Sequence, residues 1–200
     1  MSATASGGAR PQADIELGRH NNNPGGCTLL QLIREDLATH DGDWLSEGFH
    51  TLTVHRFGNW RMSVRSRLLR APLSALYKLL HWTTRLVYGI ELDYTVKIGR
   101  RVRIWHSGGM TISAIAIGDE THLRQNITMG VRRRGDPRWE RPTIGARCDI
   151  GAGAVLVGGI LVGDDCVIGA NVVIAEDVPS GSIVTVAKPV IRPRQRGIES

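Results

Sequence analysis

The sequence predicts a mainly β protein in which a parallel β-solenoid follows a small α-helical region. The first observation is a period: between residues 98 and 174, an aliphatic residue returns at nearly every sixth position. The second is the small residue that follows many of these aliphatic residues, as in IGARCD, IGAGAV and IGANVV. The third is the composition, with 24 glycines and only 5% aromatic residues. An isolated amphipathic helix would repeat near 3.6 residues and a half-buried strand near 2, so a period of six indicates stacked coils that share buried aliphatic columns.

The period runs without a slip through the second half of this segment and is interrupted twice in the first half. The regular half has its aliphatic residues at Ile144, Ile150, Leu156, Val162, Ile168 and Ile174. Earlier, Ile98, Ile104 and Met110 are in phase, and one extra residue then shifts the count to Ile117, Leu123 and Met129. A polar segment at residues 131–141 separates the two halves. An ordinary all-β domain with short strands is the alternative, and the repeated in-phase units argue against it.

Three helices are predicted before the solenoid. Thr28 opens the first with a capping box, because Gln31 stands at the third helical position. Ser46 can cap the second, and the third is expected to begin near Pro72. Spacing in the third helix predicts one packed apolar stripe made of Leu73, Leu76, Tyr77, Leu80 and Val87.

The chain therefore divides into four parts. They are a disordered or loosely attached tail (1–27), an α-helical N-terminal region (28–92), the β-helix (93–191) and a C-terminal tail (192–200).

Charge and cysteine content exclude several classes of protein. The formal net charge is +6, but the excess arginines lie in no recognisable nucleic-acid module, so no nucleic-acid partner is expected and a phosphate-bearing small ligand explains them as well. Three cysteines are typical of a reducing, cytoplasmic protein rather than of a disulfide framework. Cys148 and Cys166 occupy small-residue positions of their repeats and are expected to be apolar fillers, not nucleophiles.

No leader or membrane span is expected. Residues 1–24 lack an apolar core. The most apolar stretch, residues 71–92, is interrupted by Lys78, His81 and Arg85.

Several motifs resemble successive landmarks of the serine O-acetyltransferase family and of its relatives in exopolysaccharide clusters. They are GIELDYTVKIG, RIWHSGG, PTIG, DIGAGA and VIGANVVIAEDVP, and GFHTLTVHRFGNW resembles the helical region of the same family. The resemblance covers about residues 28–193. It implies a left-handed parallel β-helix, a handedness that the usual crossover rule does not predict.

His106 is the first candidate for chemistry. Acyl transfer from a thioester to a hydroxyl requires a base near neutral pKa, and histidine is the side chain that meets this requirement. Any one of the seven histidines is more often a packing or surface residue. His106 stands out because it aligns with the general base of the family that the chain resembles.

A carboxylate that orients the imidazole is also expected. The resemblance places one candidate in HDGDW, which offers Asp41 or, preferably, Asp43. The other candidate is Glu91, which matches an acidic family position at the entry to the solenoid. Each of these could equally be a solvated or capping carboxylate.

The arginine-rich loop at residues 131–141 is the second signal. Its arginines could meet the phosphates of coenzyme A, or the loop could simply be solvated. The family's GDRHPKIG reads ERPTIG here, so that Glu140 and Arg141 replace an arginine and a histidine that hold the amino-acid acceptor. Arg141 is the substrate-binding candidate, although the change puts serine specificity in question.

For acetyl-CoA, the resemblance places the pantetheine arm against Gly130, Ala152 and Ala170, with Lys188 near the adenylate end. A further departure is VAKPVI in place of the family's VGVPAR, which substitutes Ala187 for a glycine. The small residues are also what solenoid corners require.

These observations predict an acetyl-CoA-dependent O-acetyltransferase that needs no metal and forms no acyl-enzyme. The acceptor is L-serine or, alternatively, a sugar hydroxyl in exopolysaccharide biosynthesis. An alternative of another class is a noncatalytic solenoid that binds or assembles partners. The resemblance implies a homotrimer, which could pair into a dimer of trimers.

Overall fold

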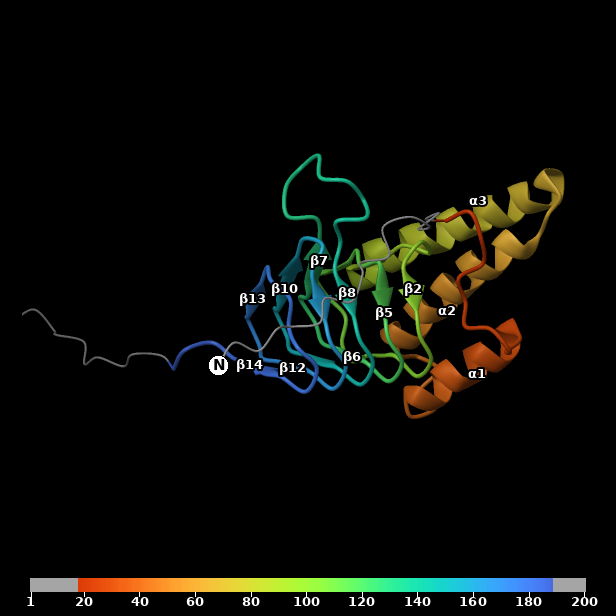
Figure 1. The fold of residues 1–200 in the computed structure, drawn as a ribbon. Helices are drawn as coiled ribbons and strands as arrows, with labels where there is room; N and C mark the ends of the chain where they lie inside the picture. The colour runs from red at the N-terminus through yellow and green to blue at the C-terminus, as the bar shows by residue number, and fades with distance from the viewer. Residues whose placement is uncertain (1–17, 189–200) are drawn as a thin grey trace, which may run out of the picture.

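The structure, a computed structural model, describes residues 18–188, which form three helices followed by a parallel β-solenoid (Figure 1). The predicted fold class is confirmed: a mainly β, parallel β-helix follows a small helical region. The expectations for residues 1–17 and 189–200, including the predicted end of the solenoid at residue 191, lie outside the described residues. Within residues 18–188, no helix combines the length and apolar character needed to cross a membrane.

The helical region contains α1 (Leu29–Thr39), α2 (Glu47–Trp60), the short 3₁₀ helix η1 (Arg61–Ser63), α3 (Arg67–Thr83) and the π-helical turn η2 (Thr84–Tyr88). The capping box of α1 is confirmed, because the Thr28 hydroxyl accepts from the Gln31 N–H while the Gln31 side chain accepts from the Thr28 N–H at 2.8 Å. The Ser46 cap of α2 is confirmed as well, since its hydroxyl accepts from the Phe49 N–H.

The prediction for α3 was wrong in two respects. The helix begins at Arg67, not near Pro72, and Pro72 lies inside it. The good helix formers that precede Pro72 extend the helix, and the proline removes only one backbone donor from an early turn. The expected packed stripe is only partly right: Tyr77 is buried and Leu73 and Leu80 are half-buried, whereas Leu76 and Val87 are 45% and 64% exposed.

Part of the segment predicted as a loose tail is attached to the helices. Asn22 N–H donates to Asn59 Oδ1 at 3.1 Å, and Asn23 Nδ2 donates to the Arg56 carbonyl at 2.9 Å. Tyr94 Oη donates to the Gly18 carbonyl at 3.3 Å. Gly18, Asn22 and Asn23 therefore contact α2 and the start of the solenoid, so this part of the segment is attached rather than disordered.

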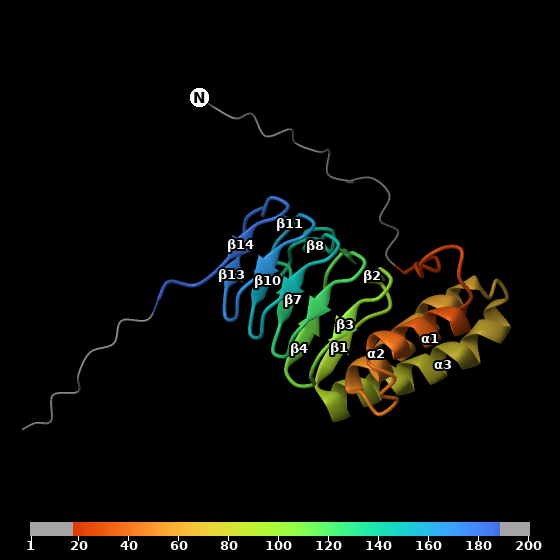
Figure 2. The ribbon, with the colours of Figure 1, turned by 90° about the horizontal axis from the view of Figure 1, so that it is seen from below.

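The solenoid coils through three parallel sheets, shown end to end in Figure 2. Sheet A contains β1 (Ile90–Leu92), β4 (Met110–Ile112), β7 (Thr128–Gly130), β10 (Val155–Val157) and β13 (Val173–Ile174). Sheet B contains β2 (Lys97–Ile98), β5 (Ala116–Ile117), β8 (Thr143–Ile144) and β11 (Leu161–Val162). Sheet C contains β3 (Arg103–Ile104), β6 (His122–Leu123), β9 (Asp149–Ile150), β12 (Val167–Ile168) and β14 (Ile183–Val184).

The aliphatic residues of the six-residue period form the core. All of them are at most 4% exposed: Ile98, Ile104, Met110, Ile117, Leu123, Met129, Ile144, Ile150, Leu156, Val162, Ile168 and Ile174. The strand register shows where the first interruption of the six-residue period lies. Met129 pairs with Ile112, not with Met110, and Met110 pairs with Ile90. The corner between β3 and β4 is therefore widened, and the next corner is shortened. The widened corner is the one that carries His106.

A buried ion pair joins the helices to the solenoid. Arg56 Nε donates to Asp36 Oδ2 at 2.9 Å, and the two side chains are at most 1% exposed. The remaining guanidinium donors reach the carbonyls of Ile98 at 2.9 Å and Gly99 at 2.7 Å. α1, α2 and the first coil are thus held in one arrangement by a single satisfied network.

Candidate active site

His106 lies in the widened corner between sheets C and A. The corner runs beside the end of η2, because Gly108 N–H donates to the Tyr88 carbonyl at 2.8 Å and Met110 N–H donates to the Gly89 carbonyl at 2.9 Å. His106 itself is exposed, and its ring makes no hydrogen bond to another residue of 18–188. An imidazole in this position is available to a ligand.

A hollow of about 470 Å³ opens next to this corner, between α3, η2 and the outer face of sheet A. Its lining comprises Trp82, Arg85, Leu86, Gly89, Glu91, Gly109, Met110 and Thr111. Glu91 points outward from β1, and its register partner is Thr111 on β4. Its carboxylate lies 3.7 Å from Arg85 Nε, with both side chains half exposed, so this ion pair is weak.

The two aspartates predicted from HDGDW do not contact His106. Asp43 is exposed and accepts from the Leu45 N–H at 2.9 Å, which fixes the turn before α2. Asp41 pairs with Arg103, and this contact lowers the pKa of the Asp41 carboxyl. Of the predicted carboxylates, Glu91 is the one that lines the hollow beside the histidine corner.

Sequence reasoning missed Glu47. This residue lies in the first turn of α2, and Ser107, the neighbour of His106, donates from Oγ to Glu47 Oε1 at 3.5 Å. α2 approaches the corner closely, since a Cβ on Gly48 would lie 2.2 Å from the Ile104 carbonyl oxygen. The only sequence signal is an acidic residue in a helical first turn, which is too common to indicate a site.

A second histidine, His50, contacts Tyr88, which in turn contacts the corner that carries His106. Its Nε2 lies 2.8 Å from the Trp44 carbonyl and its Nδ1 lies 2.8 Å from Tyr88 Oη. Because a carbonyl can only accept, Nε2 carries the proton and Nδ1 accepts from the tyrosine hydroxyl. Tyr88 in turn accepts from Gly108 through its carbonyl, so His50 and Tyr88 position the corner rather than offer a free base.

Arg141 and His106 lie at opposite ends of the strands of sheet A. Arg141 is 7% exposed, Nε donates to the Arg138 carbonyl at 2.7 Å, and Nη1 donates to Ser113 Oγ at 3.3 Å. Burial lowers the pKa of its guanidinium, and Nη2 is buried without a partner among the described residues. His106 precedes β4 and Ser113 follows it, so one chain does not bring His106 and Arg141 together.

The predicted acetyl-CoA positions fall on two of the three corners. Ala152 and Ala170 stack in the same corner column as His106, because Asn171 N–H donates to the Ala152 carbonyl at 2.9 Å and Asn126 N–H donates to the Gly108 carbonyl at 3.1 Å. Gly130 ends β7 on the other side of sheet A, and a Cβ there would meet nothing within 4 Å. Lys188 is exposed at the end of the described chain.

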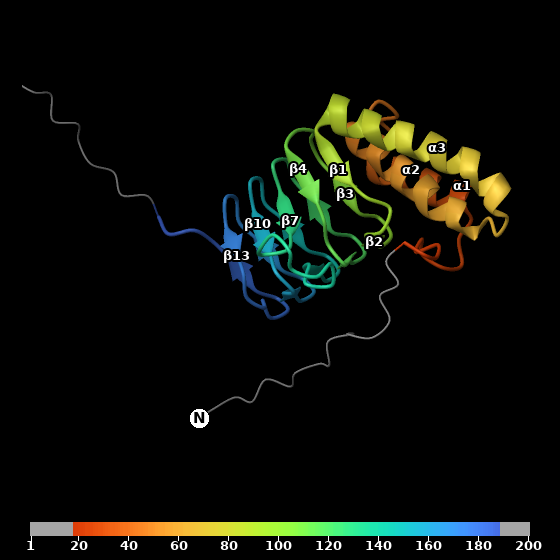
Figure 3. The ribbon, with the colours of Figure 1, turned by 90° about the horizontal axis from the view of Figure 1, so that it is seen from above.

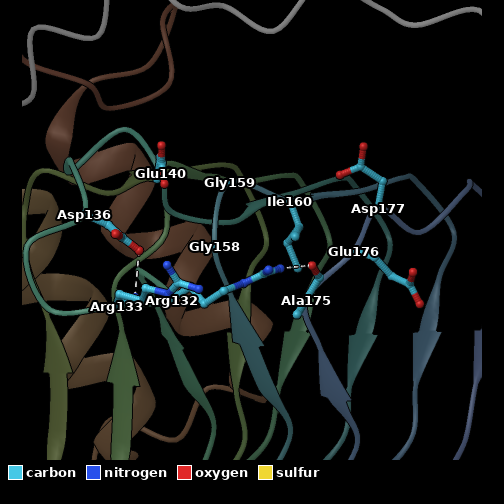
Figure 4. Close-up of a pocket in the computed structure, with 10 residues that line it drawn as sticks. All are labelled: Arg132, Arg133, Asp136, Glu140, Gly158, Gly159, Ile160, Ala175, Glu176 and Asp177. Carbon is cyan, nitrogen blue, oxygen red and sulfur yellow. Dashed lines mark hydrogen bonds between the residues drawn. The ribbon is translucent and has the colours of Figure 1, made fainter.

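The loop at residues 131–141 walls a second hollow of about 510 Å³ (Figure 4). Arg132 donates to the Ala175 carbonyl, and Arg133 N–H donates to Asp136 Oδ2 at 2.7 Å. Four carboxylates and two arginines line this hollow, namely Asp136, Glu140, Glu176, Asp177, Arg132 and Arg133. The carboxylates outnumber the arginines, and this balance disfavours coenzyme A phosphates on this side of the loop.

The cysteines take no part in the site. Cys148 and Cys166 are buried, and Cys148 Sγ donates to the Gly163 carbonyl at 3.2 Å. Burial raises the pKa of the Cys148 thiol to about 11, so the thiolate needed for nucleophilic attack is scarce at neutral pH.

The solenoid, the loop inserted into it and the exposed corner histidine together define a hexapeptide-repeat acyltransferase. A family model described as the hexapeptide repeat of succinyl-transferase matches residues 143–176. A serine acetyltransferase of Helicobacter pylori is 34% identical over 166 residues, which cover 80% of this chain and 92% of the relative. The chain belongs to the serine acetyltransferase family.

Other relatives extend this picture. A serine acetyltransferase of Mycobacterium tuberculosis is 34% identical over 86% of this chain and 68% of its own length. WcaB of Escherichia coli, an acetyltransferase named for colanic acid biosynthesis, is 30% identical over 70% of this chain and 84% of its own length. These relatives establish the chain as an acyltransferase.

Solved structures share the fold. Serine acetyltransferase isoform 3 of Entamoeba histolytica, in complex with cysteine, superposes with a TM-score of 0.66 at 22% identity over 85% of this chain. The soybean enzyme complexed with serine gives a TM-score of 0.64 at 23% identity over 81% of this chain. The chain spans 62% of the Entamoeba protein and 69% of the soybean protein.

Proposed function

We propose that this protein is an acetyl-CoA-dependent O-acetyltransferase that converts L-serine to O-acetylserine. The observation that carries the proposal is the placement of His106: an exposed imidazole, without a hydrogen-bond partner among residues 18–188, lies in a widened corner beside a hollow that Glu91 lines. Family membership supplies the reaction class, and the relatives named for serine support the acceptor.

The mechanism is a direct transfer. His106 accepts the proton of the acceptor hydroxyl as its oxygen attacks the thioester carbonyl. The carbon–sulfur bond breaks, the thiolate of coenzyme A leaves, and the imidazolium returns a proton to that sulfur. Backbone N–H groups stabilise the oxyanion, and no metal or acyl-enzyme takes part. Glu91 stabilises the imidazolium, a role that its place on β1 suits better than the turn-capping place of Asp43.

The two substrates bind at both ends of the strands of sheet A. Ala152 and Ala170 leave room for the pantetheine arm along the His106 corner, Gly130 leaves open backbone at the other end, and Lys188 offers a cation to a phosphate. The Nη2 of Arg141, which has no partner in the part of the chain that the structure describes, is a donor for a carboxylate.

Because His106 and Arg141 lie at opposite strand ends of one sheet, we propose that the complete site forms between neighbouring subunits of a homotrimer in the cytoplasm. A cyclic arrangement brings the His106 corner of each subunit to the Arg141 corner of the next. Residues from two copies would then face one acceptor.

A sugar hydroxyl is the second candidate acceptor. The segment ERPTIG differs from the family motif at the residues that hold an amino acid, and WcaB is among the relatives. The acceptor is tested by coenzyme A release from acetyl-CoA with L-serine and, separately, with a panel of sugars and nucleotide sugars. Turnover with serine supports the proposal, and turnover confined to a sugar replaces serine as the acceptor.

A further inference from the structure

His50 and Tyr88 form a side-chain pair between α2 and the end of η2. His50 Nδ1 lies 2.8 Å from Tyr88 Oη, and the two rings stack with their centroids 5.8 Å apart. The opposite nitrogen, Nε2, donates to the Trp44 carbonyl at 2.8 Å. This bond fixes the tautomer in which Nδ1 can accept from the tyrosine hydroxyl. Both side chains are half-buried, which strengthens the pair relative to one in open water.

The backbone of Tyr88 joins this pair to the histidine corner. Its carbonyl accepts from the N–H of Gly108, two residues after His106, at 2.8 Å. The next residue, Gly89, approaches the corner so closely that an added Cβ would lie 3.1 Å from the Gly109 nitrogen. A displacement of Tyr88 is therefore passed to the backbone that carries His106.

The corner needs such an anchor because its own residues hold it weakly. Gly108 and Gly109 have φ values of +104° and +57°, and glycine has no side chain to restrict the backbone. The His106 ring makes no hydrogen bond to another residue of 18–188. Ser107 Oγ reaches Glu47 Oε1 at 3.5 Å, which is the limit of a hydrogen bond.

The arrangement of the helices brings the two members of the pair together. α2 lies between α1 and α3 and contacts η2, β1 and β3 (Figure 3). η2 is a single π-helical turn, Thr84–Tyr88, at the end of α3. Such turns are rare and frequently occur at functional sites, and this one ends on the tyrosine that contacts the corner.

We infer that His50 is a positioning residue for the acetyl transfer: by accepting from the Tyr88 hydroxyl, it holds the corner in the geometry that His106 needs as a base. The inference rests on the proposed function, in which His106 takes the proton. Both ring nitrogens of His50 are engaged, so His50 acts through Tyr88 and not on the substrate. A base displaced by a fraction of its reach loses much of its effect on the rate.

Three variants separate the two hydrogen bonds of His50. Tyr88→Phe removes the hydroxyl and keeps the ring. His50→Asn places an amide near the position of Nδ1, where it can accept from Tyr88, whereas His50→Gln places one near Nε2, where it reaches Trp44 instead. Tyr88→Phe and His50→Gln are expected to lower kcat roughly tenfold, with KM for acetyl-CoA within about twofold, and His50→Asn should retain most of the activity.

Tyr94→Phe is the matched control, because it also removes one tyrosine hydroxyl, which donates to the Gly18 carbonyl. Its kcat should equal that of the natural protein. A natural kcat in Tyr88→Phe, or equal kcat values in His50→Asn and His50→Gln, would overturn the inference.

A readout without turnover separates this inference from the proposed function. Hydrogen exchange of residues 105–112 should become about fivefold faster in Tyr88→Phe and stay unchanged in Tyr94→Phe, because the corner opens more often without its anchor. If the natural protein transferred no acetyl group, faster exchange would still support the anchor while the proposed function failed. Unchanged exchange in Tyr88→Phe would overturn the anchor itself.

Discussion

The imidazole of His106 has no hydrogen-bond partner within residues 18–188. Two glutamates, Glu91 and Glu47, are therefore the candidates for the carboxylate that orients it. Glu91 lines the hollow itself, whereas Glu47 reaches the corner only through Ser107. Stabilisation of the developing imidazolium requires a charge that faces the ring.

We therefore expect Glu91→Gln to lower kcat by about 10- to 100-fold and to shift the acidic limb of its pH profile, because the charge that stabilises the imidazolium is lost. Glu47→Gln is the matched control and should change kcat less than threefold, about 0.6 kcal/mol. The measurement is the pH dependence of kcat for both variants. A larger loss in Glu47→Gln would transfer the orienting role to Glu47.

His55 predicts how the fold responds to acid. It is buried between α2 and the first coil, where Nε2 lies 2.9 Å from the Val96 carbonyl, and burial lowers its pKa to about 3. The folded protein thus binds this proton less readily than the unfolded chain, whose histidine pKa is about 6.5. The stabilisation is complete above that value and is lost as the pH falls from about 6.5 toward 3.

Between pH 6.5 and 5, protonation of His55 should cost about 1.5 kcal/mol of unfolding free energy. Urea unfolding of the natural protein and of His55→Gln at these two pH values measures it, and the variant should lose less stability over the interval. An identical loss in both proteins would show that His55 is not the titrating group.

At the scale of elements, substitutions at two glycines with different surroundings should affect folding in one case and substrate binding in the other. Gly48 lies in α2 against the Ile104 carbonyl, where an added Cβ would approach to 2.2 Å, whereas a Cβ on Gly130 would meet open space. Backbone atoms cannot yield as a flexible side chain can.

Gly48→Ala should therefore destabilise the protein by about 2 kcal/mol or more, despite the better helix propensity of alanine. Gly130→Ala should leave the melting temperature unchanged and raise KM for acetyl-CoA, because the methyl group fills the space proposed for pantetheine. Thermal unfolding together with steady-state kinetics checks both. A tolerated Gly48→Ala would contradict the close packing of α2 on the histidine corner.

The elements differ in how far sequence could predict them. α1 and α2 follow from the caps at Thr28 and Ser46, and the strands follow from the period of six, because both signals depend on neighbouring residues. The start of α3 was misplaced because proline favours a first turn without requiring one. Which of its apolar side chains face outward depends on the side that α2 covers, and helical periodicity cannot specify that.

At the scale of the whole molecule, the residues of the proposed site are divided between the two ends of the sheet A strands. Sequence located the histidine corner and the arginine loop, yet it could not show that a strand of three residues, about 10 Å, separates them. The contact between Ser107 and Glu47 was equally hidden, because it joins residues 60 positions apart.

If neighbouring copies complete the site, two inactive variants should complement each other. Mixing His106→Ala with Arg141→Lys and allowing subunits to exchange should restore up to about a quarter of the sites, those in which both contributed residues are intact. Activity of the mixture measures this, and each variant alone serves as the control. No recovery after verified exchange would place the complete site within one chain.

The most direct test of the central claim, that His106 is the base of an acetyl transfer, is coenzyme A release from acetyl-CoA and L-serine by the natural protein and by His106→Ala. His122→Ala, on the outer face of sheet C, is the matched control. We predict a loss of at least about 100-fold in kcat for His106→Ala, with unchanged thermal stability, and near-natural activity for His122→Ala. Undiminished turnover by a folded His106→Ala variant would contradict the account.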